Sequence, residues 1–299
     1  KKSDNPKFEA GNGTETDPYI IATAAQLDEV RNFPSACFEL SKDIDLSSYL
    51  NSNSSGWTPI KDFTGKFDGK KHTIKGLWIS LSSIDYVGLF ANIQGSSDNK
   101  SASVSNLFVN ISKKGITGGN CVGGICGNLS YGNIENCMVT GDISGGGYVG
   151  GIVGCNSDNY YNSSIISQCA SSGNIIANSG SVGGILAYQN GACSIENCYS
   201  IANVKTEGPY YSEAYGIGSS AENCYFAGTI SGANINYVYP IGSNTNSYYD
   251  SEKTKISGKS GALTTKQMKQ QASFQGWDFD KIWTIQEGVD YPKLRSLQK

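Results

Sequence analysis

The sequence predicts a single all-β domain, a parallel β-helix in which short strands stack coil upon coil. Three observations predict it: a recurring phrase, short runs of strand-forming residues within each copy, and turn-forming residues between the runs. The phrase reads Val-Gly-Gly-Ile, a gap, then Ile-x-Asn-Cys, and copies of varying fidelity begin at residues 87, 122, 149, 182, 214 and 238. One unit of this size cannot bury its apolar face until a neighbour stacks on it, so the repeat indicates a solenoid.

The length of the unit distinguishes a β-helix from a propeller. Successive copies begin 35, 27, 33, 32 and 24 residues apart. Each holds runs rich in Val, Ile, Tyr and Thr, divided by Gly, Asn and Ser, which favours two or three short strands. A propeller blade needs four strands in roughly 40 to 50 residues. Coils stacked in register would rise by about 4.8 Å each and align equivalent residues in columns.

Two segments flank the repeats. We expect residues 1–80 to form an N-terminal cap and the first coils, residues 81–250 the repeat coils, and residues 251–299 a C-terminal cap. Caps of this kind cover the open strand edges of the end coils, which would otherwise pair with other chains.

The N-terminal cap is expected to contain a helix. Thr23 and Gln26 have the spacing of a capping box, Leu27 and Val30 form a narrow apolar stripe, and Pro34 ends the helix. Strand-like runs then follow at 37–40, 63–67 and 72–79.

The C-terminal cap repeats this pattern. Thr264 and Gln267 form a second capping box, which predicts a helix through about Gln271. An aromatic and aliphatic cluster follows, formed by Trp277, Phe279, Ile282, Trp283, Ile285 and Tyr291. We interpret this cluster as a lid on the last coil.

Two columns of equivalent residues are predicted from the repeat. The cysteine column points into the core and contains Cys137, Cys169, Cys198 and Cys224. Leu107 and Tyr248 occupy the same position in the outer copies, so we interpret these cysteines as small buried hydrophobic residues that stay reduced. An asparagine column lies at a turn, where the amides would satisfy the backbone of the adjacent coil; it contains Asn106, Asn136, Asn197, Asn223 and Asn246.

The other cysteines leave one alternative open. The chain has nine cysteines, and Cys121, Cys126, Cys155 and Cys193 lie outside the cysteine column, so one disulfide among them is conceivable. No metal site is expected, because the closest pairs have four intervening residues and the single histidine, His72, lies in a strand-like run.

Composition excludes some classes of function. The chain has 299 residues and a net charge of −3, with arginine only at positions 31 and 295, which argues against a nucleic-acid-binding surface. No apolar run approaches the roughly 18 residues of a membrane span. The chain starts at Lys1 without an initiating methionine, which suggests a processed or trimmed protein.

The recurring phrase resembles the GLUG motif of bacterial surface proteins, including adhesin-like proteins and repeat regions of some immunoglobulin-A-cleaving peptidases. The segments 13–21, 63–69 and 276–285 resemble those that bracket such repeats. The resemblance implies a right-handed parallel β-helix, export, and often a lipid or covalent surface anchor, and it supplies no catalytic residues. Ala214-Tyr215 and Tyr239-Pro240 depart from Val-Gly, so the coils there are expected to be less regular.

An enzyme is the main alternative, because some β-helices cleave polysaccharides. Such chemistry needs two carboxylates roughly 5 to 9.5 Å apart, or acidic metal ligands with a base. The recurring acids are Glu135, Glu196 and Glu222, with Ser167 interrupting the row. Asp43 with Asp45, and Asp278 with Asp280, are explained equally well by turns. Catalytic residues and cofactors are therefore not assigned.

Tyrosine provides the remaining signal. Many of the 18 tyrosines lie in the variable loops, where they either cover strands or offer rings to a ligand. Two successive connections carry Tyr210, Tyr211 and Tyr237, with Tyr215 behind them, and we predict that these four form the binding surface. The pair 160–161 is the second candidate.

The sequence thus predicts an exported, monomeric protein at a bacterial surface that binds a glycan or a host or matrix protein without a cofactor. A carbohydrate-active enzyme and a structural spacer are the alternatives. Converging acids in a groove would favour the enzyme, and uniformly polar walls the spacer.

Overall fold

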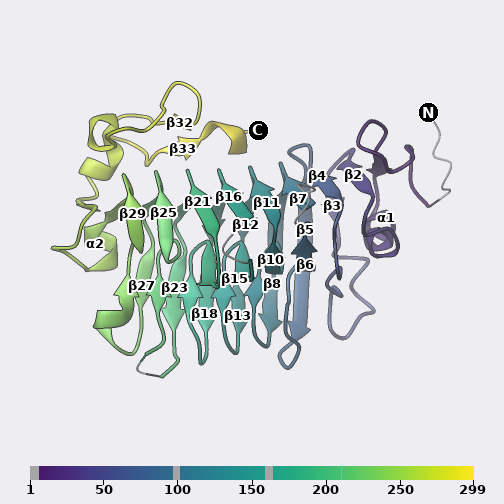
Figure 1. Cartoon of the computed structure of the whole chain (residues 1–299), viewed down its shortest axis with the longest axis horizontal. Coiled ribbons are helices and arrows are strands. Elements are labelled where there is room, and N and C mark those ends of the chain that lie inside the picture. The colour runs from purple at the N-terminus through teal and green to yellow at the C-terminus, as the bar shows by residue number, and fades with distance from the viewer. Residues whose placement is uncertain (1–6, 97–101, 159–163, 210) are drawn as a thin grey trace.

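The computed structural model describes residues 7–96, 102–158, 164–209 and 211–299, which form a parallel β-helix (Figure 1). Sheet A holds nine strands: β1 (Tyr19–Ile21), β2 (Cys37–Leu40), β4 (Lys66–Asp68), β7 (Ala102–Ser105), β11 (Gly132–Glu135), β16 (Ser164–Ser167), β21 (Cys193–Glu196), β25 (Ser220–Glu222) and β29 (Ser243–Thr245). All neighbouring strands of this sheet are parallel, as the repeat predicts.

Sheet B joins two rows of strands through the long strands β5 and β8. Its members are β3 (Ile44–Asp45), β5 (Thr73–Leu81), β8 (Phe108–Gly118), β12 (Met138–Thr140), β13 (Ile143–Gly145), β17 (Ala170–Ser172), β18 (Asn174–Ala177), β22 (Tyr199–Ser200), β23 (Asn203–Thr206), β26 (Tyr225–Phe226), β27 (Thr229–Ser231), β30 (Tyr248–Asp250) and β31 (Ala262–Leu263). In each later coil up to β26 and β27, two shorter strands take the place of one long strand such as β5 or β8.

Two smaller sheets complete the central coils. Sheet C contains β6 (Phe90–Gln94), β10 (Cys126–Ser130), β15 (Val153–Asn156) and β20 (Leu186–Gln189). Sheet D contains β9 (Val122–Gly123), β14 (Val149–Gly150), β19 (Val182–Gly183), β24 (Ala214–Tyr215) and β28 (Val238–Tyr239). Equivalent residues of the phrase pair directly, Val122 with Val149 and Val149 with Val182. The predicted stacking in register is confirmed.

The glycines of the phrase mark a tight corner between sheets D and C. A Cβ atom on Gly150 would lie 1.9 Å from the carbonyl oxygen of Val153, and one on Gly183 would lie 2.0 Å from that of Leu186. Contacts this short exclude any side chain there. The corner therefore requires the second residue of Val-Gly-Gly-Ile to be glycine in these coils.

A left-handed backbone explains the asparagine column. Asn106, Asn136, Asn197, Asn223 and Asn246 all have positive φ, between 49° and 54°, at the turn from sheet A to sheet B. Asparagine tolerates this conformation better than most residues. Asn136 Nδ2 donates to Asn106 Oδ1 at 3.1 Å. The side-chain amides of Asn136 and Asn106 thus bond side chains of the preceding coils, Asn106 and Asp68, and not the adjacent backbone as predicted.

The cysteine column lies in the core, with Cys137, Cys169, Cys198 and Cys224 each 0% exposed. Two side chains of the column accept the backbone amide of the preceding coil: Cys169 N–H donates to Cys198 Sγ at 3.3 Å, and Cys198 N–H donates to Cys224 Sγ at 3.2 Å. The last member is Ser247 and not Tyr248 as predicted, because Ser247 Oγ accepts the Cys224 amide at 3.0 Å and Tyr248 pairs with Tyr225. Burial raises the pKa of the Cys169 and Cys224 thiols, so they resist ionisation and reaction.

One disulfide joins two cysteines outside that column. Cys121 and Cys155 are bonded, with their Cα atoms 5.2 Å apart. All nine cysteines lie within the described residues, and the remaining seven are free.

Thiol counting checks this assignment. We expect seven reactive thiols in denaturant without reductant and nine after reduction. In the native state only Cys37, which is half-buried, should react readily, because the other six are buried. Fewer than seven thiols in denaturant would mean that further disulfides form, and nine would mean that the Cys121–Cys155 bond is absent.

A short helix covers the first coil, as predicted. α1 (Ala24–Glu29) continues as a 3₁₀ turn, η1 (Val30–Asn32), and both Leu27 and Val30 are fully buried. Thr23 Oγ1 accepts the Gln26 amide at 3.2 Å, and Gln26 Oε1 accepts the Ala22 amide at 2.7 Å. The capping box is therefore present, with the returning bond displaced by one residue.

The C-terminal end differs from the prediction. The expected helix is replaced by two 3₁₀ turns, η3 (Gln267–Lys269) and η4 (Gln271–Ser273), although Gln267 Oε1 accepts the Thr264 amide at 2.9 Å. The last coil is instead followed by α2 (Ser251–Thr254) and by β31, which pairs with β30. Ile256 packs into the main core from this connection.

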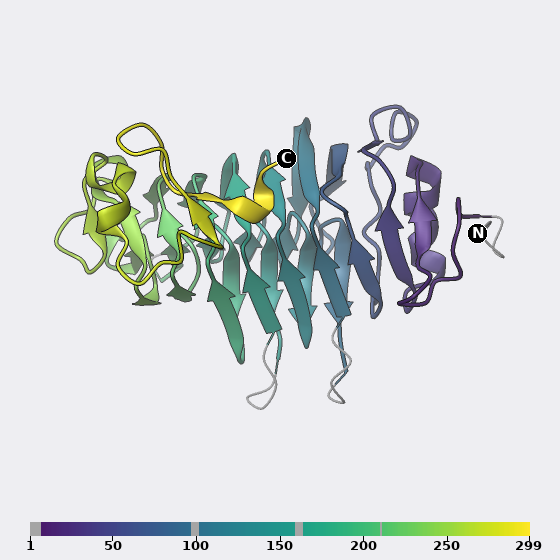
Figure 2. The same ribbon diagram turned by 90° about the horizontal axis from the view of Figure 1, so that it is seen from above.

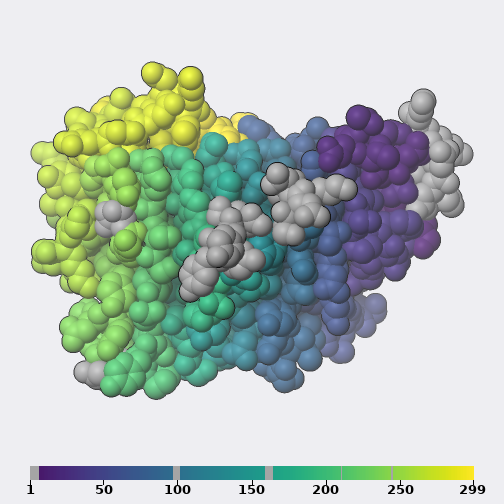
Figure 3. Space-filling model, viewed as in Figure 1, coloured from purple at the N-terminus to yellow at the C-terminus, as the bar shows by residue number. Residues whose placement is uncertain are grey.

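The aromatic cluster lies along the flank of the coils and does not cover the last one. Residues 275–299, called the C-terminal segment below, run back across the outer side of sheet B (Figures 2 and 3). The segment contains the antiparallel pair β32 (Trp283–Thr284) and β33 (Lys293–Leu294), and the turn η5 (Arg295–Leu297). Lys299 Nζ reaches Thr73 Oγ1 at 2.6 Å, near the start of β5. The segment therefore spans most of the solenoid.

Candidate binding surface on the C-terminal coils

Tyr211 and Tyr237 lie on two connections that run from sheet B to sheet D, whereas Tyr215 lies in β24. One follows β23 and the other follows β27, where the turn η2 (Ile235–Tyr237) precedes β28. Figure 1 shows both connections at the same edge of the solenoid. Tyr210 and the pair 160–161 lie outside the described residues.

Tyr211, which is exposed, and Tyr237, which is half-buried, lie together in this region. Their ring centroids are 5.6 Å apart and the rings are nearly perpendicular, at 76°. Tyr211 is 73% exposed, and Ile235, two residues before Tyr237 in the turn η2, is 62% exposed. Single exposed apolar side chains are common on protein surfaces, whereas a cluster of them can mark an interaction site. We call Tyr211, Tyr237 and Ile235 the tyrosine edge.

Tyr215 has a different place from the one predicted. It is only 9% exposed and stacks on Tyr239, its partner in the next coil, with centroids 5.2 Å apart. Burial, together with the carboxylate of Glu213, raises the pKa of Tyr215, so its hydroxyl stays protonated. Lys259 Nζ lies 5.1 Å from the centroid of the Tyr239 ring. Tyr215 thus packs beneath this region and is not part of its exposed surface.

Tyr239, Ile235 and Lys259 were missed by the sequence reasoning. Tyr239 could have been found, because aligning the copies places it opposite Tyr215. Ile235 and Lys259 lie in connections whose lengths vary, so no repeat position marks them. Contact among these connections follows from the stacking of successive coils.

The outer face of sheet A carries the acids considered for catalysis. Glu196 and Glu222 are register partners on adjacent strands, whereas Ser167 separates Glu196 from Glu135. A shallow hollow of about 420 Å³ lies over this part of the sheet; its polar lining includes Gln189, Ser194, Ser220, Glu222, Ser243 and Thr245. Gln189 Oε1 accepts from the Ser219 hydroxyl at 2.9 Å and from that of Ser220 at 3.2 Å. The sheet thus presents carboxylates and hydroxyls in regular rows.

The single histidine belongs to an ion cluster. His72 Nδ1 lies 3.5 Å from Asp43, which also contacts Lys75 at 2.8 Å and Lys299 at 3.8 Å. The hydrogen bond from Lys75 is the main reason that the pKa of Asp43 falls to about 2. Among the described residues no group of three His, Cys, Asp or Glu side chains is placed to hold a metal ion.

These features define the class of the protein as a parallel β-helix with an exposed aromatic edge. Residues 118–144 match the GLUG motif, so the chain carries the motif that its recurring phrase predicts. In the described part of the chain, no helix has the length and apolar character needed to span a membrane.

Two curated proteins are similar to part of the chain. A protein of Evansella cellulosilytica, provisionally named a Gly-rich membrane protein, is 35% identical over 144 residues, which is 46% of this chain and 16% of that protein. Halomucin of Haloquadratum walsbyi is 33% identical over 157 residues, which is 48% of this chain and 2% of that protein. The chain therefore matches only a small part of these much longer relatives.

A solved structure has the same fold throughout. It is a Bacteroides ovatus protein, provisionally named an immunoglobulin A1 protease, with a TM-score of 0.73. The likeness covers 98% of this chain and 96% of that chain at 23% identity. At this identity the likeness shows the fold alone, and it supports the parallel β-helix over the whole chain.

Proposed function

We propose that this chain is a binding module exposed at a cell surface, and that the tyrosine edge contacts a glycan or a protein ligand. The observation that carries the proposal is the contact between Tyr211 and Tyr237 at an exposed edge of two successive coils. Tyrosine offers an apolar face and a hydroxyl at small cost in side-chain entropy, so it serves both sugars and peptides.

Three further observations support a surface role. The chain carries the GLUG motif, and the names of its relatives include a membrane protein and a halomucin. Net charge is low, at −3 over 299 residues, which is poorly suited to nucleic acid. Export, by a lipid anchor or by secretion, and a monomeric state are parts of the same proposal.

An array of glycans and extracellular-matrix proteins tests the proposal. We expect the purified chain to bind at least one array member above a matched β-helix control that lacks surface tyrosines. Binding to no member would contradict the proposal and would favour a structural spacer. Immunoglobulin A1 is included on the array because the structural neighbour is named after a protease of this protein. Its cleavage would show that this chain has that activity.

A carbohydrate-active enzyme is the second candidate, favoured by one observation. Glu196 and Glu222 are aligned on adjacent strands beside the hollow on sheet A. Adjacent strands place such carboxylates about 5 Å apart, near the separation found in retaining glycosidases. Release of reducing ends from any bound glycan, abolished in Glu196→Gln and in Glu222→Gln, would favour this candidate over simple binding.

A further inference from the structure

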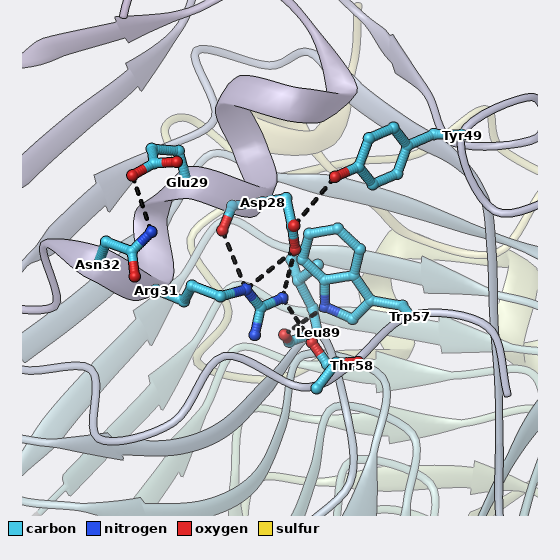
Figure 4. A network of polar contacts seen from close by, with 8 residues as sticks. All are labelled: Asp28, Glu29, Arg31, Asn32, Tyr49, Trp57, Thr58 and Leu89. Atoms are coloured by element: carbon cyan, nitrogen blue, oxygen red, sulfur yellow. Dashed lines mark hydrogen bonds and ion pairs between the residues drawn. The ribbon is translucent and has the colours of Figure 1, made fainter. Parts of the chain in front are cut away.

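A second hollow lies at the opposite end of the molecule, beside α1. Its volume is about 730 Å³, within the range of small-molecule sites. The lining residues that matter here are Asp28, Arg31, Tyr49, Asn53, Trp57 and Thr58. Figure 4 shows the network that holds most of them in place. The hollow is far from the tyrosine edge, because α1 and β27, the strand that precedes η2, lie at opposite ends of the solenoid in Figure 1.

Arg31 is held rigidly but keeps one nitrogen available. Its Nε donates to Asp28 Oδ1 at 3.0 Å, and its Nη2 donates to Asp28 Oδ1 and to the Thr58 carbonyl oxygen, the latter at 2.9 Å. The guanidinium lies 5.4 Å from the centroid of Trp57, whose own Nε1 is bonded to the Leu89 carbonyl oxygen at 3.0 Å. Arg31 Nη1 has no hydrogen-bond partner among the residues that the structure describes.

The other groups leave the hollow rich in donors. Asp28 uses both carboxylate oxygens, Oδ1 for Arg31 and Oδ2 for the Tyr49 hydroxyl at 2.9 Å. Asn53 Oδ1 accepts the Ser55 amide at 3.0 Å, which leaves its Nδ2 as a donor. Arg31 and Asn53 therefore each keep a donor for a ligand, whereas both carboxylate oxygens of Asp28 already accept hydrogen bonds. A ligand that supplies acceptors fits this arrangement.

We infer that this hollow binds a sugar residue that bears a carboxylate. A carboxylate is the acceptor that a guanidinium binds most strongly. A sugar suits the site better than a simple ion, because the hollow is larger than an ion requires. Tyr49, at 41% exposed, also offers a ring face, and Ser52, Ser54 and Thr58 offer hydroxyls. The inference is independent of the tyrosine edge.

Titration followed by NMR tests the inference with three probes: D-glucuronate, D-glucose and acetate. We expect glucuronate to bind at least about tenfold more tightly than either of the others, a difference of about 1.4 kcal/mol. Glucose lacks the carboxylate and acetate lacks the ring, so each control removes one half of the recognition. Equal affinity for glucuronate and glucose would overturn the role of Arg31. Equal affinity for glucuronate and acetate would overturn the choice of a sugar.

Two variants locate the site. Arg31→Gln should lower glucuronate affinity by about tenfold or more, because it removes the charged donor. Asn53→Asp keeps the oxygen that accepts the Ser55 amide and replaces the donor by a negative charge, so it should weaken glucuronate binding without disturbing the fold. If Arg31→Gln fails to fold because Asp28 loses its partner, Asn53→Asp decides alone. Unchanged affinity in folded Asn53→Asp would contradict the inference, and Val289→Ala, an exposed position outside both hollows and the tyrosine edge, should bind glucuronate like the parent.

Discussion

Replacing Ile166 by aspartate is expected to destabilise the protein by more than about 4 kcal/mol at neutral pH. Ile166 is 0% exposed, and it pairs with Ile134 on one side and with Ile195 on the other. A carboxylate there would be buried without a partner, and each coil depends on its neighbours for burial. Thermal denaturation followed by circular dichroism measures the effect.

The same variant should lose stability as pH rises. Burial raises the pKa of a carboxyl group, so the folded state would keep its proton above pH 4 while the unfolded state loses it. The folded state then binds more protons, and the free energy of unfolding falls with increasing pH. If the difference in free energy of unfolding between the parent and the variant is the same at pH 4 and pH 7, residue 166 is accessible to water.

Ile165→Asp is the matched control. Ile165 is the preceding residue of β16 and points to the opposite face of sheet A, where it is half-buried. Successive residues of a strand alternate between faces, so the same change on the outer face should cost much less, about 1 kcal/mol. Equal losses in the two variants would mean that the inward assignment of the phrase is wrong.

Trp283→Ala is expected to lower the free energy that holds the C-terminal segment against sheet B by about 3 to 5 kcal/mol. Trp283 is 0% exposed, stacks on Trp277 with centroids 4.4 Å apart, and donates to Asn197 Oδ1 at 3.4 Å. Removing the ring leaves a cavity between the segment and Tyr225, whose centroid is 5.9 Å away.

Hydrogen exchange separates a local effect from a global one. We expect amide protection to fall across residues 275–299 while the coils of sheets A and D keep theirs, because the segment contributes no strand to those sheets. Val289→Ala, at a position that is 52% exposed, should leave protection unchanged. Unaltered protection in Trp283→Ala would contradict the docking of the segment against sheet B.

Much of the fold could be predicted because the phrase repeats its chemistry at each coil. The pairs Val122–Val149 and Ile134–Ile166 follow from aligning the copies. The strand predicted at 63–67 has wrong bounds. The observed strand is Lys66–Asp68, and Phe63 makes only an isolated bridge to Ile93. That stretch precedes the regular copies, so no alignment could fix its register.

Features outside the phrase were harder to predict. The disulfide between Cys121 and Cys155 joins positions before and after the phrase in two different coils, and gaps of unequal length obscure such contacts. The C-terminal segment docks through contacts such as Tyr225 with Pro292, which are separated by 67 residues, and local propensity carries no information about them. The hydrogen bonds of the capping box at Thr264 are present, but a 3₁₀ turn follows them in place of the predicted helix.

The candidate site was predictable only in part. The proximity of Tyr211 and Tyr237 follows from their place on successive connections, as the repeat arithmetic indicates. The burial of Tyr215 depends on its stacking against Tyr239, which composition alone does not reveal. The hollow beside α1 was not predicted, because it forms between a helix and a loop that have no counterpart in the repeats.

Titration of the strongest array ligand against three proteins tests the central claim most directly. The proteins are the parent chain, the Tyr211→Ala/Tyr237→Ala variant, and the Tyr148→Ala/Tyr188→Ala variant. The control is another pair of neighbouring tyrosines, which are stacked with centroids 4.3 Å apart, and its Tyr188 is 39% exposed. We expect the first variant to lose about 2 kcal/mol or more of binding free energy with little loss of stability, and the control to bind like the parent. Equal affinity in all three folded proteins would contradict the tyrosine edge as the contact surface.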